Sequence, residues 1–189
     1  MTASSITADA PPLAHRSIRN WWPTVLGLAV AAVQLSTGPD TDTVASVTGV
    51  AVLCYLAAAA LRRRWAAWAG CFVFPTTVAV CQVVGVTWWV VLGVMALALV
   101  VVGLLVRASR RELTAQGAAL IVYGGAAVAA LFLEPRLGIA LAGVGLVLHA
   151  GWDIVHYRRN AVVHRSLTEF CVMLDVPVGI GAIVLAIVG

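Results

Sequence analysis

Two histidines and an aspartate lie at spacings that place them on one face of a helix, inside an apolar stretch of the chain. They belong to the segment His149-Ala-Gly-Trp-Asp153-Ile-Val-His156, in which the three side chains are four and three residues apart. Residues at these spacings share a helix face. Imidazole and carboxylate groups together can ligate a transition metal or move protons. Because ionisable groups are costly inside a membrane, their presence there indicates a functional site.

A second carboxylate, Asp175, lies on the next apolar segment, at a depth near that of His149 or Asp153. Consecutive segments joined by a short connection usually pack together, so Asp175 is predicted to face the histidine-bearing stripe. We take His149, Asp153 and Asp175 as candidate catalytic residues. The secondary candidates are polar or sulfur-bearing side chains near this level or near mid-membrane, namely Asn160, His164, Glu169, Cys171, Tyr55 and Tyr123.

Some of the secondary candidates also have an ordinary structural interpretation. Asn160 continues the stripe by one turn, and His164 follows if the helix extends that far. The cysteine precedes Asp175 by four residues and shares its face. Glu169 is also explained as a solvated carboxylate near a helix N-terminus. The two tyrosines are also explained as packing residues whose hydroxyls are satisfied locally.

The first chemical interpretation of the cluster is a metal centre. His149, Asp153, His156 and Asp175 are the candidate ligands, and iron, zinc, copper or manganese suits such a set. On a straight helix the two histidines are about 10.5 Å apart along the axis, which is long for one ion. Each histidine pairs comfortably with Asp153, and a dinuclear site with a bridging aspartate is a further arrangement.

Two other interpretations compete with the metal centre. A carboxyl group in a low-dielectric site can stay protonated near neutrality and exchange a proton with a histidine, as a metal-free prenyl cyclase or isomerase requires. Alternatively, the cluster carries protons for a coupled transporter, or joins two helices in a non-catalytic scaffold. The chain is short and has no repeated halves, which argues against a transporter.

The composition indicates a polytopic membrane protein. Hydrophobic residues make up 62% of the chain and charged residues 11%, whereas soluble domains carry about 25% charged residues. All 12 basic residues are arginines, so no lysine is present to form a Schiff base with retinal or a carbonyl substrate. The positive charge is explained by membrane topology rather than by a nucleic-acid partner. The four cysteines lie in apolar segments and are expected to be free.

Seven apolar segments are long enough, at about 17–25 residues, to cross a bilayer as helices. Their approximate limits are 21–38, 43–61, 65–84, 86–106, 113–133, 137–157 and 168–188. The third and fourth are separated only by Gly85 and its neighbours, which leaves open whether they are a hairpin or one interrupted span. We therefore predict an all-α integral membrane bundle, with residues 21–189 as one seven-span domain and residues 1–20 as a disordered cytoplasmic tail.

The arginines support this division because all but Arg136 fall on one side of a seven-span bundle. The positive-inside rule then predicts a cytoplasmic N-terminus and an external C-terminus in the plasma (inner) membrane. Small residues at Gly138, Ala142 and Gly145 lead along one helix face to His149. They indicate either close helix packing or a cavity above the cluster.

The function that these patterns favour is a small membrane-embedded, metal-dependent hydrolase or oxidoreductase. Its expected partners are membrane lipids and a lipophilic small-molecule substrate, lipid or isoprenoid-like, reached from the cytoplasmic side. That side is favoured because the outer half of the predicted bundle is poor in ionisable groups, with Gln34 and Gln82 as its polar side chains. The metal would activate water or oxygen, or polarise the substrate.

Overall fold

The computed structural model describes residues 21–188, and these form helices with no strand among them. The elements are α1 (Trp22–Ser36), α2 (Thr41–Leu61), α3 (Trp65–Val84), α4 (Trp88–Leu105), α5 (Arg110–Ala119), a π-helical turn (Leu120–Gly124), α6 (Gly125–Ala130), α7 (Pro135–Arg159) and α8 (Arg165–Val188). The predicted all-α class is confirmed. The predicted disordered tail at 1–20 lies outside the described residues.

Within residues 21–188, six helical stretches are long and apolar enough to cross a membrane, with α5, the π-helical turn and α6 forming one of them. The third and fourth predicted segments are two separate helices, because Gly85 ends α3 in the left-handed region at φ 71°. The seventh stretch, α1, is shorter than predicted. It has Pro23 in its first turn and ends at Ser36, ahead of Gly38 and Pro39. At 15 residues α1 is about 22 Å long, against a hydrocarbon core of about 30 Å.

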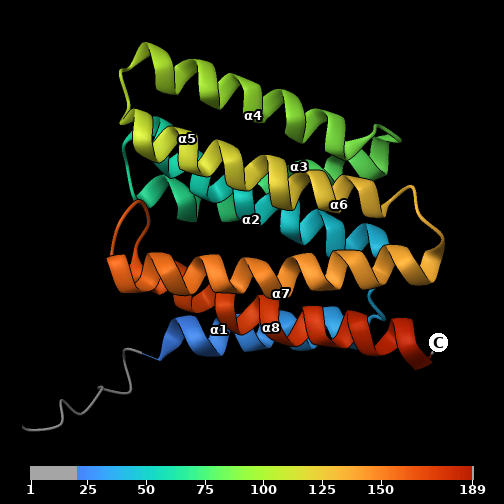
Figure 1. Cartoon of the computed structure of the whole chain (residues 1–189). Helices are drawn as coiled ribbons and strands as arrows, with labels where there is room; N and C mark the ends of the chain where they lie inside the picture. The colour runs from blue at the N-terminus through green and yellow to red at the C-terminus, as the bar shows by residue number, and fades with distance from the viewer. Residues whose placement is uncertain (1–20, 189) are drawn as a thin grey trace, which may run out of the picture.

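Helix α2 lies at the centre of the bundle. It packs against α3, α4, α5 and α7. In its most apolar 18-residue stretch, 78% of the residues are buried inside the bundle. Its alanines, valines and leucines surround the whole helix, as expected of a helix with no solvent-facing side. Helices α7 and α8 also pack together over an extensive contact, and α1 packs along α8 (Figure 1). The polar stripe of α7 therefore faces both α2 and α8.

Helix α7 begins and ends with clear local signals. The Glu134 carboxylate accepts a hydrogen bond from the backbone N–H of Leu137, and Pro135 occupies the first turn. The helix ends at Arg159 because Asn160 adopts the left-handed conformation at φ 47°, which asparagine tolerates. Asn160 and His164 thus do not continue the helical stripe, contrary to the sequence-based expectation.

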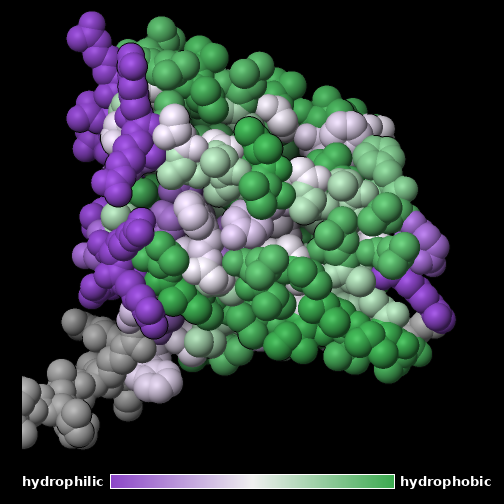
Figure 2. All heavy atoms as spheres, viewed as in Figure 1, coloured by the Kyte–Doolittle hydropathy of each residue, from purple (hydrophilic) through white to green (hydrophobic). Residues whose placement is uncertain are grey.

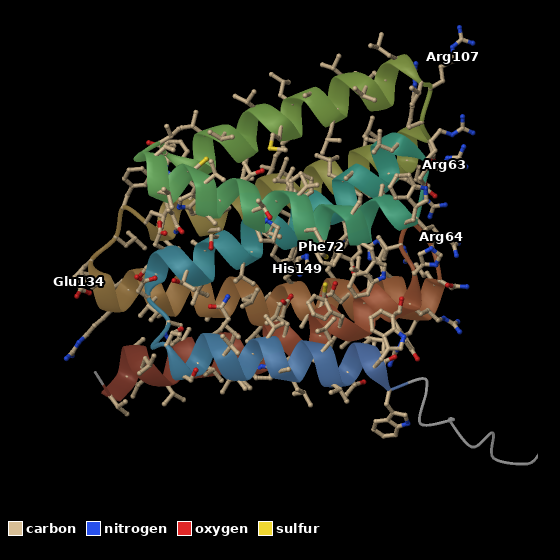
Figure 3. All side chains as sticks on the ribbon, turned by 180° about the vertical axis from the view of Figure 1, so that it is seen from behind. Arg63, Arg64, Phe72, Arg107, Glu134 and His149 are labelled. Atoms are coloured by element: carbon tan, nitrogen blue, oxygen red, sulfur yellow. The ribbon has the colours of Figure 1, made fainter. Side chains whose placement is uncertain are left out.

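Charged side chains gather at the two ends of the bundle and leave an apolar band between them (Figure 2). Arg63, Arg64 and Arg107 lie at one end, and Glu134 lies at the opposite end (Figure 3). The loops after α2 and α4 carry arginines and lie at the first of these ends, where α7 also ends with Arg158 and Arg159 and α8 begins with Arg165. We refer to it below as the arginine end. Such a band flanked by polar ends is compatible with a membrane bundle.

Candidate functional site

The centre of the site is formed by His149 and Asp153 of α7 and Asp175 of α8, all with no exposed surface. The Nδ1 atom of His149 lies 2.9 Å from Oδ2 of Asp175 and 3.5 Å from Oδ2 of Asp153. The short loop between α7 and α8 and their close packing bring the two aspartates to the same histidine. The structure thus brings together three of the four predicted ligands. We call these three residues the His/Asp/Asp cluster.

Three polar atoms of this cluster have no hydrogen-bond partner among the described residues. They are Nε2 of His149, Oδ2 of Asp153 and Oδ1 of Asp175, and all three are buried. Buried polar groups are almost always hydrogen-bonded, so three unpaired polar atoms in one place need an explanation. One potential ligand atom from each residue lies within 4.8 Å of the others, so the three residues together could hold a metal ion.

Tyr55 of the central helix α2 is the fourth member of the site. Its hydroxyl donates a hydrogen bond to Oδ1 of Asp153, across 98 residues of sequence. Its ring lies edge-on to the rings of His149 and His156, at centroid distances of 5.8 and 4.9 Å. Tyr55 is fully buried. Its hydroxyl therefore fixes the orientation of Asp153 and leaves the other carboxylate oxygen directed to the cluster.

If the cluster holds a metal ion, we expect Tyr55→Phe to weaken its binding by about 10–100-fold, the range typical of groups that orient ligands. The change removes one hydroxyl and leaves the aromatic ring, so little packing is lost. The measurement is a titration of the purified protein with manganese(II), followed by electron paramagnetic resonance. Tyr123→Phe is the matched control, because the Tyr123 hydroxyl bonds to the backbone oxygen of Leu148 instead of to a cluster residue. Equal affinities for the two variants would contradict a role for Tyr55.

Tyr123 lies on the other side of His149. The two rings meet edge-on at a centroid distance of 5.3 Å, and Tyr123 is half-buried. It belongs to the π-helical turn between α5 and α6, and such turns are frequent at functional sites. Tyr123 therefore forms part of the wall around the histidine.

His156 lies outside the cluster, one turn beyond Asp153 toward the arginine end. Its Nδ1 is 3.0 Å from the backbone oxygen of Trp152, so Nδ1 carries the proton and donates. Its Nε2 must then accept from the side-chain amide of Gln116, 3.0 Å away. The Gln116 oxygen in turn accepts from the indole of Trp152 at 3.3 Å. Both nitrogens of His156 are thus engaged, and the structure does not place it among the potential ligands.

Gln116 and Trp152 were not among the sequence-based candidates. A signal for Gln116 existed, because it lies seven residues before Tyr123 and so shares its helix face. Trp152 carries no such signal, since its position relative to Asp153 places it off the polar stripe. Gln116 is fully buried, which made its pairing with a second polar side chain necessary.

The remaining secondary candidates lie at the edge of the site or away from it. Glu169 accepts a hydrogen bond from the hydroxyl of Thr24 and so ties α8 to α1. Cys171 is buried one turn before Asp175. The backbone oxygen of Asn160 accepts a hydrogen bond from Arg64 at 2.7 Å, and His164 directly precedes α8. The four cysteines are free, as expected, although the sulfurs of Cys54 and Cys71 are only 3.7 Å apart.

Fold and site together define an all-helical bundle of apolar helices with a buried His/Asp/Asp cluster between two of them. No family model matches the chain, and neither a curated protein nor a solved structure matches it. Function therefore has to follow from the chemistry of the cluster itself.

Proposed function

We propose that this chain is a small membrane-embedded, metal-dependent enzyme with a lipophilic substrate, and that His149, Asp153 and Asp175 hold the metal. The observation that carries the proposal is the group of three buried, unpaired polar atoms in a cluster whose potential ligand atoms lie within 4.8 Å of one another. A divalent cation would neutralise the two carboxylates and provide a partner for their unpaired oxygens. Buried charges in proteins are normally paired or coordinate a metal.

One imidazole and two carboxylates suit iron, zinc or manganese better than copper(I), which prefers sulfur ligands. Three protein ligands leave coordination positions for water or substrate, as in catalytic rather than structural sites. The bound ion would activate water or oxygen, or polarise the substrate. The protein's own contribution is to orient Asp153 through Tyr55 and to exclude bulk water by burying the cluster completely.

We also propose that all seven helical stretches span the plasma membrane, with the arginine end in the cytoplasm. The clustering of arginines at one end supports this orientation through the positive-inside rule. His149 lies ten residues from the last residue of α7, which is about 15 Å from the arginine end. In this topology α1 is the shortest span, and local thinning of the bilayer accommodates it.

The test is elemental mass spectrometry on protein purified in detergent without chelators. We expect near-stoichiometric metal in the wild type and its loss in Asp153→Ala and Asp175→Ala. Two controls remove the same residue types elsewhere. Asp42→Ala removes a carboxylate that bonds Gln82 and Trp88 at the opposite end, and His156→Ala removes a histidine of α7. Both should keep the metal.

A wild type that stays metal-free after reconstitution with iron, zinc, copper and manganese would refute the metal-dependent enzyme. Metal-free acid–base chemistry would then be the better account, because His149 contacts both aspartates and is placed to share a proton with either. An activity of this kind is expected to survive the addition of a chelator and to be lost in Asp153→Asn.

A further inference from the structure

A cleft of about 480 Å³ opens between α1 and α3 and extends inward to the His/Asp/Asp cluster. Leu26 and Val30 of α1 line one side, and Phe72 and Pro75 of α3 line the other. Cys171 and Asp175 of α8 form part of its inner wall. Figure 3 views this side of the bundle, with α3 above α1 and Phe72 labelled. The cleft thus connects the outer surface of the bundle with one of the proposed ligands.

The walls of this cleft are apolar over most of their length. Asp175 is the charged side chain among the lining residues, and no arginine of the described residues 21–188 lines the cleft. Polar lining side chains gather toward the end opposite the arginines, where Gln34, Thr43, Ser46 and Gln82 lie. A mainly apolar cavity with a few convergent polar groups is typical of a small-molecule site, and its size falls in the usual range of about 300–1,000 Å³.

Aromatic side chains close the cleft toward the arginine end. The rings of Trp22 and Trp68 lie 5.2 Å apart and so join α1 to α3, while Phe170 lies 5.4 Å from Trp68. The indole of Trp68 also donates a hydrogen bond to Ser166 of α8 at 3.2 Å. Access from water at the arginine end is therefore blocked by this aromatic group.

The mouth of the cleft faces sideways instead. Phe72 is 73% exposed and Leu26 is 42% exposed. Phe72 lies between the two charged ends of the bundle (Figure 3). Large apolar side chains at this exposure are stable beside hydrocarbon rather than beside water. Helix α1 packs on α8, and α3 packs on α2, which leaves the space between α1 and α3 available to a chain-like molecule.

We infer that the cleft admits one hydrocarbon chain of a membrane lipid laterally from the bilayer. The chain's apolar length contacts α1 and α3, and its inner end lies against Cys171, one turn from Asp175. The further claim that this chain belongs to the substrate rests on the proposed function. The substrate class is then a bilayer lipid whose reacting bond lies along or next to a linear chain, and a water-soluble headgroup alone does not suffice for binding.

The test uses phosphatidylcholine vesicles that contain the reconstituted wild type and a phosphatidylcholine with a diazirine in one acyl chain. After irradiation, adducts are mapped by mass spectrometry. We expect adducts on Cys171 and Asp175 as well as on Phe72. Because the first two are only 4% and 0% exposed, lipid bound around the outside of the bundle does not reach them. Adducts confined to exposed residues, or cross-links from Phe72 to a second copy of the chain, would overturn the inference.

A matched pair of variants locates the path. Ala79→Phe fills the cleft from an exposed position of α3 that lines it, and it should abolish the adducts on Cys171 and Asp175. Ala98→Phe adds the same ring at an exposed position of α4, away from the cleft, and should leave them unchanged. Thermal unfolding of both variants checks that the bundle is intact. A folded Ala79→Phe protein with wild-type adducts would also count against the cleft.

Metal content measured on the same samples separates this inference from the proposed function. Asp153→Ala is expected to lose metal and to retain adducts on Cys171, because Asp153 does not line the cleft. Adducts in the cleft of a protein that never binds metal would support the lipid site and refute the metal-dependent enzyme. Bound metal without buried adducts would refute the lipid site and leave the enzyme standing.

Discussion

Replacing His149 by leucine is expected to lower the free energy of unfolding by about 3–5 kcal/mol, the usual cost of removing one partner from a buried charge pair. Asp153 and Asp175 both contact Nδ1 of the histidine, and neither has exposed surface. Without the imidazole, two carboxylates remain in an apolar interior with Tyr55 as the hydrogen-bond donor to one of them. Denaturant unfolding in detergent micelles, followed by tryptophan fluorescence, measures the loss.

His156→Leu is the matched control on the same helix. It leaves the Gln116 amide without its partner, which costs about 1–3 kcal/mol. A double variant, His149→Leu with Asp175→Leu, should recover part of the stability lost in the single variant, because it removes one of the two uncompensated carboxylates. Equal losses at His149 and His156, with no recovery in the double variant, would show that the cluster is not held together by charge.

The same variants distinguish an enzyme from a scaffold. If the cluster only joins α7 to α8, His149→Leu loses stability and the wild type binds no metal. If the cluster is a metal centre, the wild type gains stability on adding the ion, and His149→Leu does not. Ligand binding to the folded state stabilises it in proportion to the logarithm of the free ligand concentration, so the gain is measurable by titration.

The helices were predictable from the sequence because backbone polar groups in a bilayer must be paired within the segment, which turns each long apolar run into a helix. Predicted limits such as 65–84 match α3 residue for residue. The length of α1 was not predictable from hydropathy, since Thr37 is followed by a glycine at φ 75° that ends the helix early. A hydropathy average is taken over many residues, so it does not detect a single turn that ends a helix.

The site was predictable only where its contacts are local in sequence. His149 and Asp153 share a helix face, and Asp175 follows across one short loop. Tyr55 was a secondary candidate because nothing near it in sequence indicates Asp153 as its partner. The place of His156 depends on Gln116, which lies 40 residues away on another helix. Long-range pairings of this kind require the rotation of each helix about its own axis, which a sequence with apolar residues on all faces does not determine.

The glycines of α7 show the same limitation. Gly138, Ala142 and Gly145 pointed to close packing or to a cavity above the cluster, and the structure shows close packing at Gly138 and open space beside Gly145. A Cβ added at Gly138 would lie 2.6 Å from the backbone oxygen of Ala130, whereas one at Gly145 would meet nothing within 4 Å. Helices α7 and α8 approach each other closely at Gly143 and Gly179, which were not singled out by spacing.

Gly179→Ala is expected to abolish metal binding while removing no polar group. Its new Cβ would lie 2.8 Å from the backbone oxygen of Gly143 and 2.7 Å from a methyl group of Val147. Since the backbone oxygen cannot rotate away, α8 has to move outward. Gly179 is one turn from Asp175, so this movement lengthens the 2.9 Å contact between Asp175 and His149. Overpacking of this kind costs about 1–3 kcal/mol.

Gly145→Ala is the matched control, because it adds the same methyl group to α7 at a position with open space. Alanine is favoured over glycine inside a helix by about 1 kcal/mol, so this variant should be as stable as the wild type or more stable, and should keep its metal. The two variants thus differ in sign as well as in size. Manganese titration and unfolding of Gly179→Ala that match the wild type would mean that α7 and α8 do not approach at these glycines. In that case the close contact between Asp175 and His149, on which the proposed metal centre depends, would also be wrong.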